Sequence, residues 1–432
     1  MKFRYIAAVI TGLFAVPAAA ECPQASNNTI IHAGAVIVDA DSRPLGPSTI
    51  EIVDGRICDI SDGHSTDAAD HDTTMIDLRD KTVAPGLIDL HTHLSGDPSG
   101  EFWRAATTPP EWFSLVAAKN ARVTAKAGFT TVRDVGSRSA QVMQMLRRAT
   151  AEGMLPGPRI ITAGNSIAIV GGHADGSNGF RAELADVLGT GFTCTGEVEC
   201  AKKVRLASKY GADLIKITAT GGVLSQQGRG LEAHFTDAEM RSIVQTAETL
   251  GLKVAAHAHG ARGIEAAARA GVHTIEHGTY LDRAAARAMV ENGTTLVPTL
   301  MAFEGIKTNL GTGYYTPVVE DKIRAVSEAA GTIVERARRW GVNVAFGTDA
   351  GVFPHGQNAG EFALLKANGM SDRDAFASAT TGAAAVIGME GQIGRVALGY
   401  SADLIALGAN PLEDATTLES IDWVMVRGRV ID

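Results

Sequence analysis

Leu87-Ile88-Asp89-Leu90-His91-Thr92-His93 is the stretch of sequence that decides the fold. It is a short apolar run that ends in two histidines two positions apart. Side chains i and i+2 of a strand face the same side, so His91 and His93 point the same way. Two neighbouring imidazoles repel each other when protonated but suit a cation when neutral. The stretch therefore predicts a buried strand that ends at a metal site.

Further apolar runs have the length of buried strands: 130–135, 159–164, 214–219, 253–258, 273–277, 295–299 and 342–347. Helical periodicity fills most of the gaps, for example at 112–126, 198–210, 237–250, 262–270 and 321–340, and two more helices are expected at 358–368 and 372–387. Eight strand–helix units over roughly 300 residues predict a closed (β/α)8 barrel of the TIM type. An open doubly wound sheet would need a glycine-rich phosphate turn after an early strand, and the sequence has none.

The two ends of the chain have a different sequence pattern. Short β-branched runs separated by turn residues fill 29–84 and return after residue 403, and Arg427-Gly428-Arg429 echoes Asp54-Gly55-Arg56. Chain ends often lie close together, so we expect them to build one small domain. We predict a β-sandwich domain from residues 21–84 and 390–432, and a catalytic barrel from residues 85–389.

The reactive residues of such a barrel lie at the C-terminal ends of its strands. Histidines end the first, fifth and sixth strands, and an aspartate ends the eighth: His91, His93, His257, His277 and Asp349. Charged and imidazole side chains seldom occupy buried strand positions, so chance does not explain this set. It predicts a metal centre in the mouth of the barrel.

Lys216 interrupts the apolar run of the fourth strand. An unpaired buried ammonium costs several kcal/mol or more. Two interpretations remain open from the residues alone. Lys216 forms a buried ion pair, or its pKa is depressed and it reacts with CO2 to give a carbamate, an anionic ligand able to bridge two cations.

The set of histidines, lysine and aspartate on these strands resembles the ligand set of the metal-dependent amidohydrolase superfamily, in its binuclear branch with a carboxylated lysine. The resemblance extends over almost the whole chain after residue 20, and residues 84–93, 394–404 and 426–429 also contribute to it. Residues 170–173, 220–225, 257–260, 275–279 and 347–351 are similar to the prolidase-like, Xaa-amino-acid carboxypeptidase branch, which includes exported ochratoxin-type amidases. None of the six ligand positions departs from the pattern.

The resemblance implies a role for each ligand. His91, His93 and Asp349 hold one zinc ion, His257 and His277 hold the other, and carboxylated Lys216 bridges them. The metals share a hydroxide that attacks the scissile carbonyl. Asp349 takes the hydroxide proton and passes it to the leaving amine.

Three more histidines are candidates for the substrate site. By resemblance, His173 binds the substrate α-carboxylate; an ordinary loop histidine is the alternative. His259 is expected to contact the tetrahedral oxyanion in catalysis or to orient a neighbouring group. His355 lines the pocket or lies on the surface. Glu276, on the other side of its strand from His277, is interpreted as structural.

The N-terminus has the three parts of a secretory signal peptide at 1–20, with cleavage after Ala20. Loss of Lys2 and Arg4 changes the formal net charge from −9 to −11, since 1–20 holds no acid. An acidic chain without a basic stripe does not predict a nucleic-acid partner. With no other apolar run long enough to span a bilayer, we predict a soluble periplasmic or secreted protein, for which a homo-oligomer is one option.

Export favours disulfides. Cys194 and Cys200 bracket a short loop that a disulfide can close, and Cys22 and Cys58 form a second possible pair.

Three functions compete at this point. The first is a di-zinc hydrolase that cleaves the amide bond to a C-terminal amino acid in a dipeptide, an N-acyl amino acid or an ochratoxin-like amide. The second is a cyclic-amide hydrolase or deaminase of the imidazolonepropionase type, which uses one metal and needs no lysine bridge. The third is a non-catalytic binding protein that kept only the scaffold. Such a protein should have lost metal-ligating residues, and all six are present in this sequence.

Overall fold

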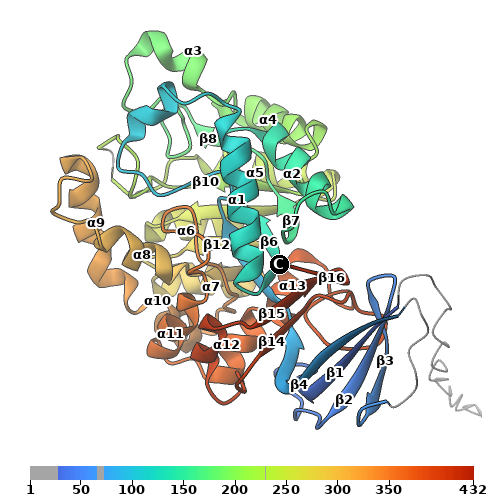
Figure 1. Ribbon diagram of the computed structural model, residues 1–432. Coiled ribbons are helices and arrows are strands. Elements are labelled where there is room, and N and C mark those ends of the chain that lie inside the picture. Colours follow the sequence, from blue (N-terminus) through green and yellow to red (C-terminus); the bar gives the residue numbers. More distant parts are fainter. Residues whose placement is uncertain (1–27, 66–72, 229) are drawn as a thin grey trace, which may run out of the picture.

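The computed structural model describes residues 28–65, 73–228 and 230–432. The expected signal peptide and Cys22 lie outside these residues. Figure 1 shows an α/β part with its helices around parallel strands, and beside it a sheet that contains strands from both ends of the chain. Among the described residues, no helix has the length and apolar character needed to cross a membrane.

The sheet built from both chain ends has seven strands. Its order is β16 (Arg429–Val430), β15 (Trp423–Val426), β14 (Leu404–Leu407), β4 (Thr73–Pro85), β1 (Asn28–Val36), β2 (Ser48–Val53) and β3 (Arg56–Asp62). β14 pairs antiparallel with β4, with Leu404 opposite Pro85, and this ladder joins the two ends. Ile31, Val83 and Met425 belong to its buried core. These seven strands form a single sheet, and the stacked sheets of a sandwich stay a prediction.

Two tight turns of this sheet meet in space. Asp54-Gly55 joins β2 to β3, and Arg427-Gly428 joins β15 to β16. Asp54 and Arg427 each have φ of 50°, in the left-handed region that a non-glycine side chain seldom adopts. Glycine is required beside them, since a Cβ on Gly55 would lie 2.6 Å from the carbonyl oxygen of Arg427.

The α/β part contains two larger parallel sheets whose strands are largely buried, and the short parallel pair β8 (Ala168–Ile169) and β9 (Thr193–Cys194). One has the order β5 (Leu87–Thr92), β6 (Phe129–Asp134) and β7 (Arg159–Thr162). The other has the order β10 (Leu214–Thr218), β11 (Lys253–Ala258), β12 (Thr274–His277) and β13 (Thr295–Val297). The first and last residues of these seven strands lie within about two positions of the expected ones, and most of the strands are slightly shorter than expected.

Backbone hydrogen bonds connect the two parallel sheets on both sides. The amide of Asp213 donates to Thr162 at 2.8 Å, next to β7 and β10. On the other side, residues 343–350 lie between β13 and β5: the Ala345 amide donates to Leu296 at 2.9 Å, and the Asp349 amide donates to His91 at 2.7 Å. The eighth strand expected at 342–347 is therefore not a regular strand: within that range its pairing is the single isolated bridge between Val344 and Leu296.

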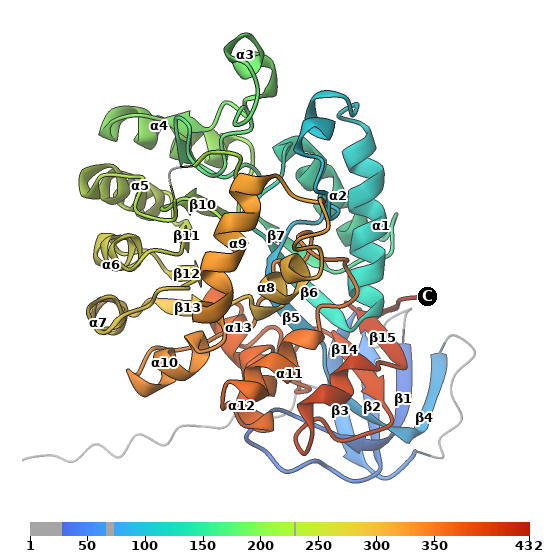
Figure 2. The same ribbon diagram turned by 90° about the vertical axis from the view of Figure 1, so that its left-hand side faces the viewer.

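Helices flank the parallel strands. Figure 2 shows α4 (Glu197–Lys209), α5 (Asp237–Thr249), α6 (Ala261–Ala270) and α7 (Arg283–Glu291) along the outer side of β10 to β13. The other helices of eight or more residues are α1 (Trp112–Lys126), α2 (Ala140–Glu152), α8 (Leu300–Lys307), α9 (Pro317–Ala330) and α11 (Gly360–Ala367). α5 begins with a capping box formed by Thr236 and Glu239. A disulfide joins Cys194, at the end of β9 (Thr193–Cys194), to Cys200 in α4, as expected.

Two expected helices are broken. The helix expected at 321–340 is α9 followed by α10 (Ile333–Arg339), with Gly331 between them. The helix expected at 372–387 is α12 (Asp372–Ser378) followed by α13 (Thr381–Ile387), and Thr380 between them has φ −127° and ψ −98°, outside the helical region. Apolar periodicity continues across each break, so the sequence pattern did not reveal it.

Candidate metal centre and active site

A cavity of about 710 Å³ opens at the carboxyl ends of the parallel strands. Eight of the nine predicted site residues line it: His91, His93, His173, Lys216, His257, His259, His277 and Asp349. The walls further out combine aromatic side chains, among them Phe102, Phe180 and Phe303, with charged ones such as Arg138 and Asp175. One concave site thus collects residues that lie up to about 260 positions apart.

His91, His277 and Asp349 form one group of potential metal ligands. Their ligand atoms lie within 4.8 Å of one another, and all three residues are buried. Asp349 Oδ1 is 3.4 Å from His91 Nε2 and 3.1 Å from His93 Nε2. That oxygen is buried yet accepts no hydrogen bond from any described residue. Two imidazole nitrogens and an unsatisfied carboxylate oxygen around one point fit a bound cation.

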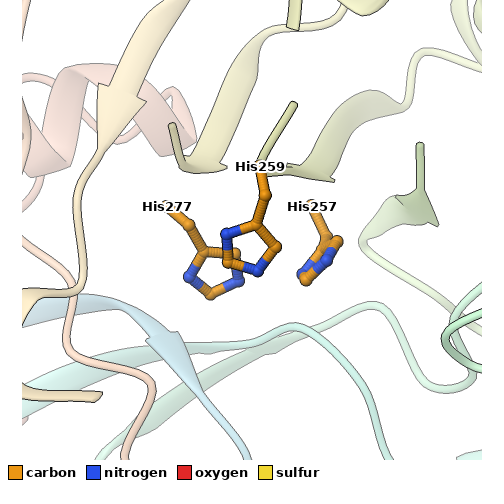
Figure 3. Close-up of side chains that lie close together, drawn as sticks. All are labelled: His257, His259 and His277. Carbon is orange, nitrogen blue, oxygen red and sulfur yellow. The ribbon is translucent and has the colours of Figure 1, made fainter. Parts of the chain in front are cut away.

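His257, His259 and His277 form a second group, drawn in Figure 3. They come from the ends of the neighbouring strands β11 and β12. The ring centroids of His257 and His277 are 4.7 Å apart, and those of His259 and His277 are 4.9 Å apart. His277 belongs to both groups and so lies between them. His93 and Lys216 belong to neither group.

Hydrogen bonds fix the orientation of three imidazoles. The Nδ1 atom of His91 lies 2.8 Å from Glu276 Oε2, that of His93 2.7 Å from the Gly136 carbonyl, and that of His277 2.7 Å from Thr299 Oγ1. An acceptor at Nδ1 places the proton there and leaves Nε2 with a free lone pair. In His91 and His93, that nitrogen is the one that faces Asp349.

Burial keeps most of these imidazoles neutral. It lowers the pKa of His91 to about 4, helped by the charge of Lys216. Burial and the neighbouring imidazoles lower the pKa values of His257 and His277 well below the ordinary value. Neutral imidazole is the form that binds metal, so the protein presents these rings ready for ligation at neutral pH.

Lys216 lies in the middle of β10 and is 3% exposed. Burial lowers its pKa to about 8. Among the described residues, no carboxylate lies within ion-pair distance of its ammonium. The buried ion pair that the sequence left open is therefore absent from this part of the chain, and the lowered pKa makes the free amine more accessible.

His173 lies beside the second group of ligands. Its ring stacks on that of His257 with the centroids 4.4 Å apart, and its Nδ1 hydrogen-bonds Ser225 Oγ. Burial lowers the pKa of His173 to about 3, and the neighbouring His259 is the second largest cause of this lowering. His173 is therefore a neutral hydrogen-bonding group at neutral pH and not a cation.

The expected placement of His355 in the pocket is wrong. His355 is buried behind the site, with Nδ1 3.0 Å from Thr124 Oγ1 and Nε2 3.2 Å from the carbonyl oxygen of His93. It supports the backbone of a candidate ligand and does not line the cavity. The chain segment after Asp349 turns back against α1, which strand periodicity cannot reveal.

Sequence reasoning also missed the part played by Glu276. Its carboxylate contacts His91 through one oxygen and accepts from Arg133 Nη2 at 2.8 Å through the other. Burial alone would raise the pKa of Glu276, but the Arg133 charge and the His91 hydrogen bond hold it below its ordinary value. A fully buried glutamate in an apolar strand was the available signal, and it is the same signal that singled out Lys216.

Asp89, from the same stretch as His91, is a further residue that supports the site. It is fully buried and accepts from the His91 amide at 3.0 Å, the Thr348 hydroxyl at 2.6 Å and the Asn358 side chain at 2.8 Å. It thus ties β5 to the segment that carries Asp349.

Residues 82–431 match the amidohydrolase family. An ochratoxinase from Aspergillus niger is 30% identical over 404 residues, which cover 89% of this chain and 82% of that protein. The crystal structure of a Xaa-Pro dipeptidase with methionine bound in its active site is 39% identical, has a TM-score of 0.86, and covers 93% of this chain and 99% of that one. An imidazolonepropionase from Ectopseudomonas mendocina is 26% identical over 394 residues, which cover 82% of this chain and 85% of that protein.

The matched region contains all the residues of both ligand groups and the strands that carry them. The chain therefore belongs to the amidohydrolase family, in the branch of ochratoxinase and the prolidase-like structures, and it is a hydrolase that acts on amide bonds.

Proposed function

We propose that this protein is an exported binuclear zinc hydrolase that cleaves the amide bond to a C-terminal amino acid. Asp349 Oδ1 carries the proposal: it is buried, accepts no hydrogen bond from a described residue, and faces the Nε2 atoms of two histidines. An acceptor in that position, between two imidazole nitrogens, suits a cation.

The frame of the site is a closed (β/α)8 barrel in this proposal. Two parallel sheets of three and four strands are joined on one side through Thr162 and on the other through residues 343–350. Closure would bring the carboxyl ends of all strands to one rim, which is where the reactive residues of such barrels lie.

Two groups of ligands suit two ions. His91 and Asp349 of the first group, with His93 added, would hold one ion, and His257 and His277 of the second group the other. Lys216, which belongs to neither group, would lie between the ions as a carbamate formed with CO2. Two zinc ions bound there would supply a water activated at neutral pH and would polarise the scissile carbonyl.

The chain's own residues then perform three tasks. Asp349 accepts the proton of the attacking water and donates it to the leaving amine. His259, held by a 2.6 Å hydrogen bond between its Nδ1 and Thr279 Oγ1, stabilises charge on the carbonyl oxygen. His173 donates to the α-carboxylate of the leaving amino acid.

Small substrates fit this site. The cavity admits a dipeptide or an N-acyl amino acid, and its aromatic walls favour an apolar acyl group. The bound methionine of the similar dipeptidase supports recognition of a free amino acid. In the same proposal the mature protein is periplasmic or secreted, acts without nucleic acid or membrane, and self-associates.

A substrate panel combined with metal analysis tests the proposal. N-acyl amino acids and dipeptides that differ only at the C-terminal residue are compared with the same compounds blocked as C-terminal amides. We expect cleavage of the free acids, with about two zinc ions per chain. Equal cleavage of acids and amides would refute the carboxypeptidase specificity. One metal per chain, together with turnover of a cyclic amide, would favour the imidazolonepropionase-like alternative.

A further inference from the structure

A second cavity, of about 190 Å³, lies at the opposite end of the parallel strands from the metal site. It forms where Arg159, the first residue of β7, meets the two tight turns of the end sheet. Arg56 and Arg427 line it from those turns, and Ser401 and Gln392 complete its polar wall. The echo between Asp54-Gly55-Arg56 and Arg427-Gly428-Arg429 thus has a spatial counterpart: the turns stand together and present arginines to one space.

Positive charge exceeds negative charge around this cavity. Asp403 is the buried acid beside it, and it is occupied: it accepts from Arg159 Nη2 at 2.9 Å and from the backbone amide of Arg427 at 2.8 Å. Asp54 also lines the cavity but is exposed, and it lies within ion-pair distance of none of the three guanidinium groups. Three guanidinium charges therefore face two carboxylates, and Arg427 has no ion-pair partner among the residues described.

Two arginines that line this cavity each have a side-chain donor without an acceptor in the described part of the chain. The Nε atoms of Arg159 and Arg427 are buried, and neither has a hydrogen-bond partner among the described residues. Nearly all buried donors in proteins have an acceptor, and an exception calls for an explanation such as a bound water or ion. Here two exceptions occur on neighbouring arginines that line the same space.

The conformation of Arg427 adds to this. Burial and the charge of Arg159 lower the pKa of Arg427 to about 10, so the side chain remains charged at neutral pH despite its environment. Its backbone is also in the left-handed region, at φ 50°. The fold therefore holds a charged arginine in spite of desolvation and a neighbouring like charge, and a bound anion would offset both of these costs.

We propose that this cavity is a binding site for a small tetrahedral oxyanion, of the phosphate or sulfate type, held by Arg56, Arg159 and Arg427. A guanidinium presents several N–H donors in a fixed plane, which suits an oxyanion with several acceptor oxygens. The volume is sufficient for such an ion with a few water molecules. The site is separate from the metal centre and does not depend on the proposed reaction.

The bound anion would join three segments that are distant in sequence. It would bridge the β2–β3 turn, the β15–β16 turn and the start of β7, and so connect the end sheet to the parallel strands. Occupancy would stabilise this junction without changing the chemistry at the opposite end of the strands.

Calorimetric titration of the holoenzyme with inorganic phosphate and with sulfate tests the proposal. Sodium chloride and acetate at equal ionic strength serve as reference anions. Arg427→Asn removes the guanidinium and keeps a residue that tolerates the left-handed conformation. Arg429→Gln is the matched control, because Arg429 is exposed, lies two positions away and does not line the cavity.

We expect wild type and Arg429→Gln to bind one phosphate or sulfate that Arg427→Asn does not bind. At an anion concentration of about 100 times the dissociation constant, the same two proteins should gain about 3 °C in Tm over chloride. Any phosphate bound at the metal centre is retained in all three and cancels from the comparison.

Equal phosphate and sulfate binding by Arg427→Asn and wild type would overturn the proposal, and so would acetate binding as tight as that of both oxyanions. If Arg427→Asn fails to fold, Arg56→Gln is used in its place. Arg56 is exposed, and its loss should weaken the same binding event at least tenfold; unchanged affinity would again overturn the site.

Discussion

The Glu276 carboxylate lies 2.8 Å from Nδ1 of His91, in a fully buried contact between β12 and β5. This contact fixes the proton of His91 on Nδ1, so that Nε2 faces Asp349 with a free lone pair. The other oxygen of Glu276 accepts from Arg133, which keeps the carboxylate ionised and in place. The orientation of a candidate metal ligand thus depends on two charged residues that never reach the cavity.

Glu276→Gln should weaken metal binding about 10–100-fold, the usual effect of losing a carboxylate behind a ligating histidine. The measurement is competition with a chelator of known affinity. Glu239→Gln is the control, because Glu239 is also buried but caps α5 away from the site. Metal affinity that is equal in Glu276→Gln and in the control would show that Glu276 has no role in ligand orientation.

Lys216→Met should lose the second metal and nearly all activity, since methionine fills the same space without a nitrogen for carboxylation. Lys216→Ala should be similar, and short-chain carboxylic acids should restore part of its activity by entering the vacated space. Lys253→Met is the control: Lys253 lies on the next strand, at the end away from the cavity. Full activity of Lys216→Met with both metals bound would exclude the bridge.

Asp349→Asn should fold normally and lose at least about 10²–10⁴-fold in kcat, the range expected when a general base is removed. Asn tolerates the φ of 64° found at this position, so the backbone need not change. Asp97→Asn is the control, since Asp97 lines the same cavity but pairs with Lys119. Activity of Asp349→Asn within tenfold of wild type would remove Asp349 from the mechanism.

The sequence was most informative where a residue conflicts with its surroundings. His91, Lys216 and His277 interrupt or end apolar runs, and the structure brings all three to one cavity. Glu276 carries the same conflict, but alternation along the strand placed it on the other side from His277, and it was interpreted as structural. In parallel strands that are buried on both faces, alternation does not reveal which side chains contact a ligand from behind, because neither side of the strand is solvent.

Other features depend on distant contacts that leave no local pattern. The breaks at Gly331 and Thr380 interrupt an apolar periodicity that continues across them. The chain after Asp349 folds back so that His355 contacts Thr124, a residue more than two hundred positions away. The arginine cavity likewise needs three segments from different parts of the chain, and only the echo between two turns hinted at it.

Acid should destabilise the protein through His355. Burial lowers its pKa to about 4 from 6.5 in the unfolded chain, so its contribution to stability is complete above pH 6.5 and is lost as the pH falls through 4. This amounts to about 3 kcal/mol. In chelated protein, the difference in free energy of unfolding between wild type and His355→Gln should shrink by that order between pH 7 and pH 4. A difference that stays constant over this range would show that His355 titrates normally.

His173 should decide whether a free carboxylate is recognised. Ser225 Oγ hydrogen-bonds its Nδ1, and if the hydroxyl is the donor, Nε2 carries the proton and can donate it to the substrate. A hydrogen bond to a charged group is worth about 1.5–3 kcal/mol, or roughly 10–150-fold in kcat/KM. His173→Ala should lose this factor on free-acid substrates and little on their C-terminal amides. His355→Gln, which alters a histidine outside the cavity, should show no such difference between acids and amides. If His173→Ala loses the same factor on both kinds of substrate, His173 supports the site as a whole and another group binds the carboxylate.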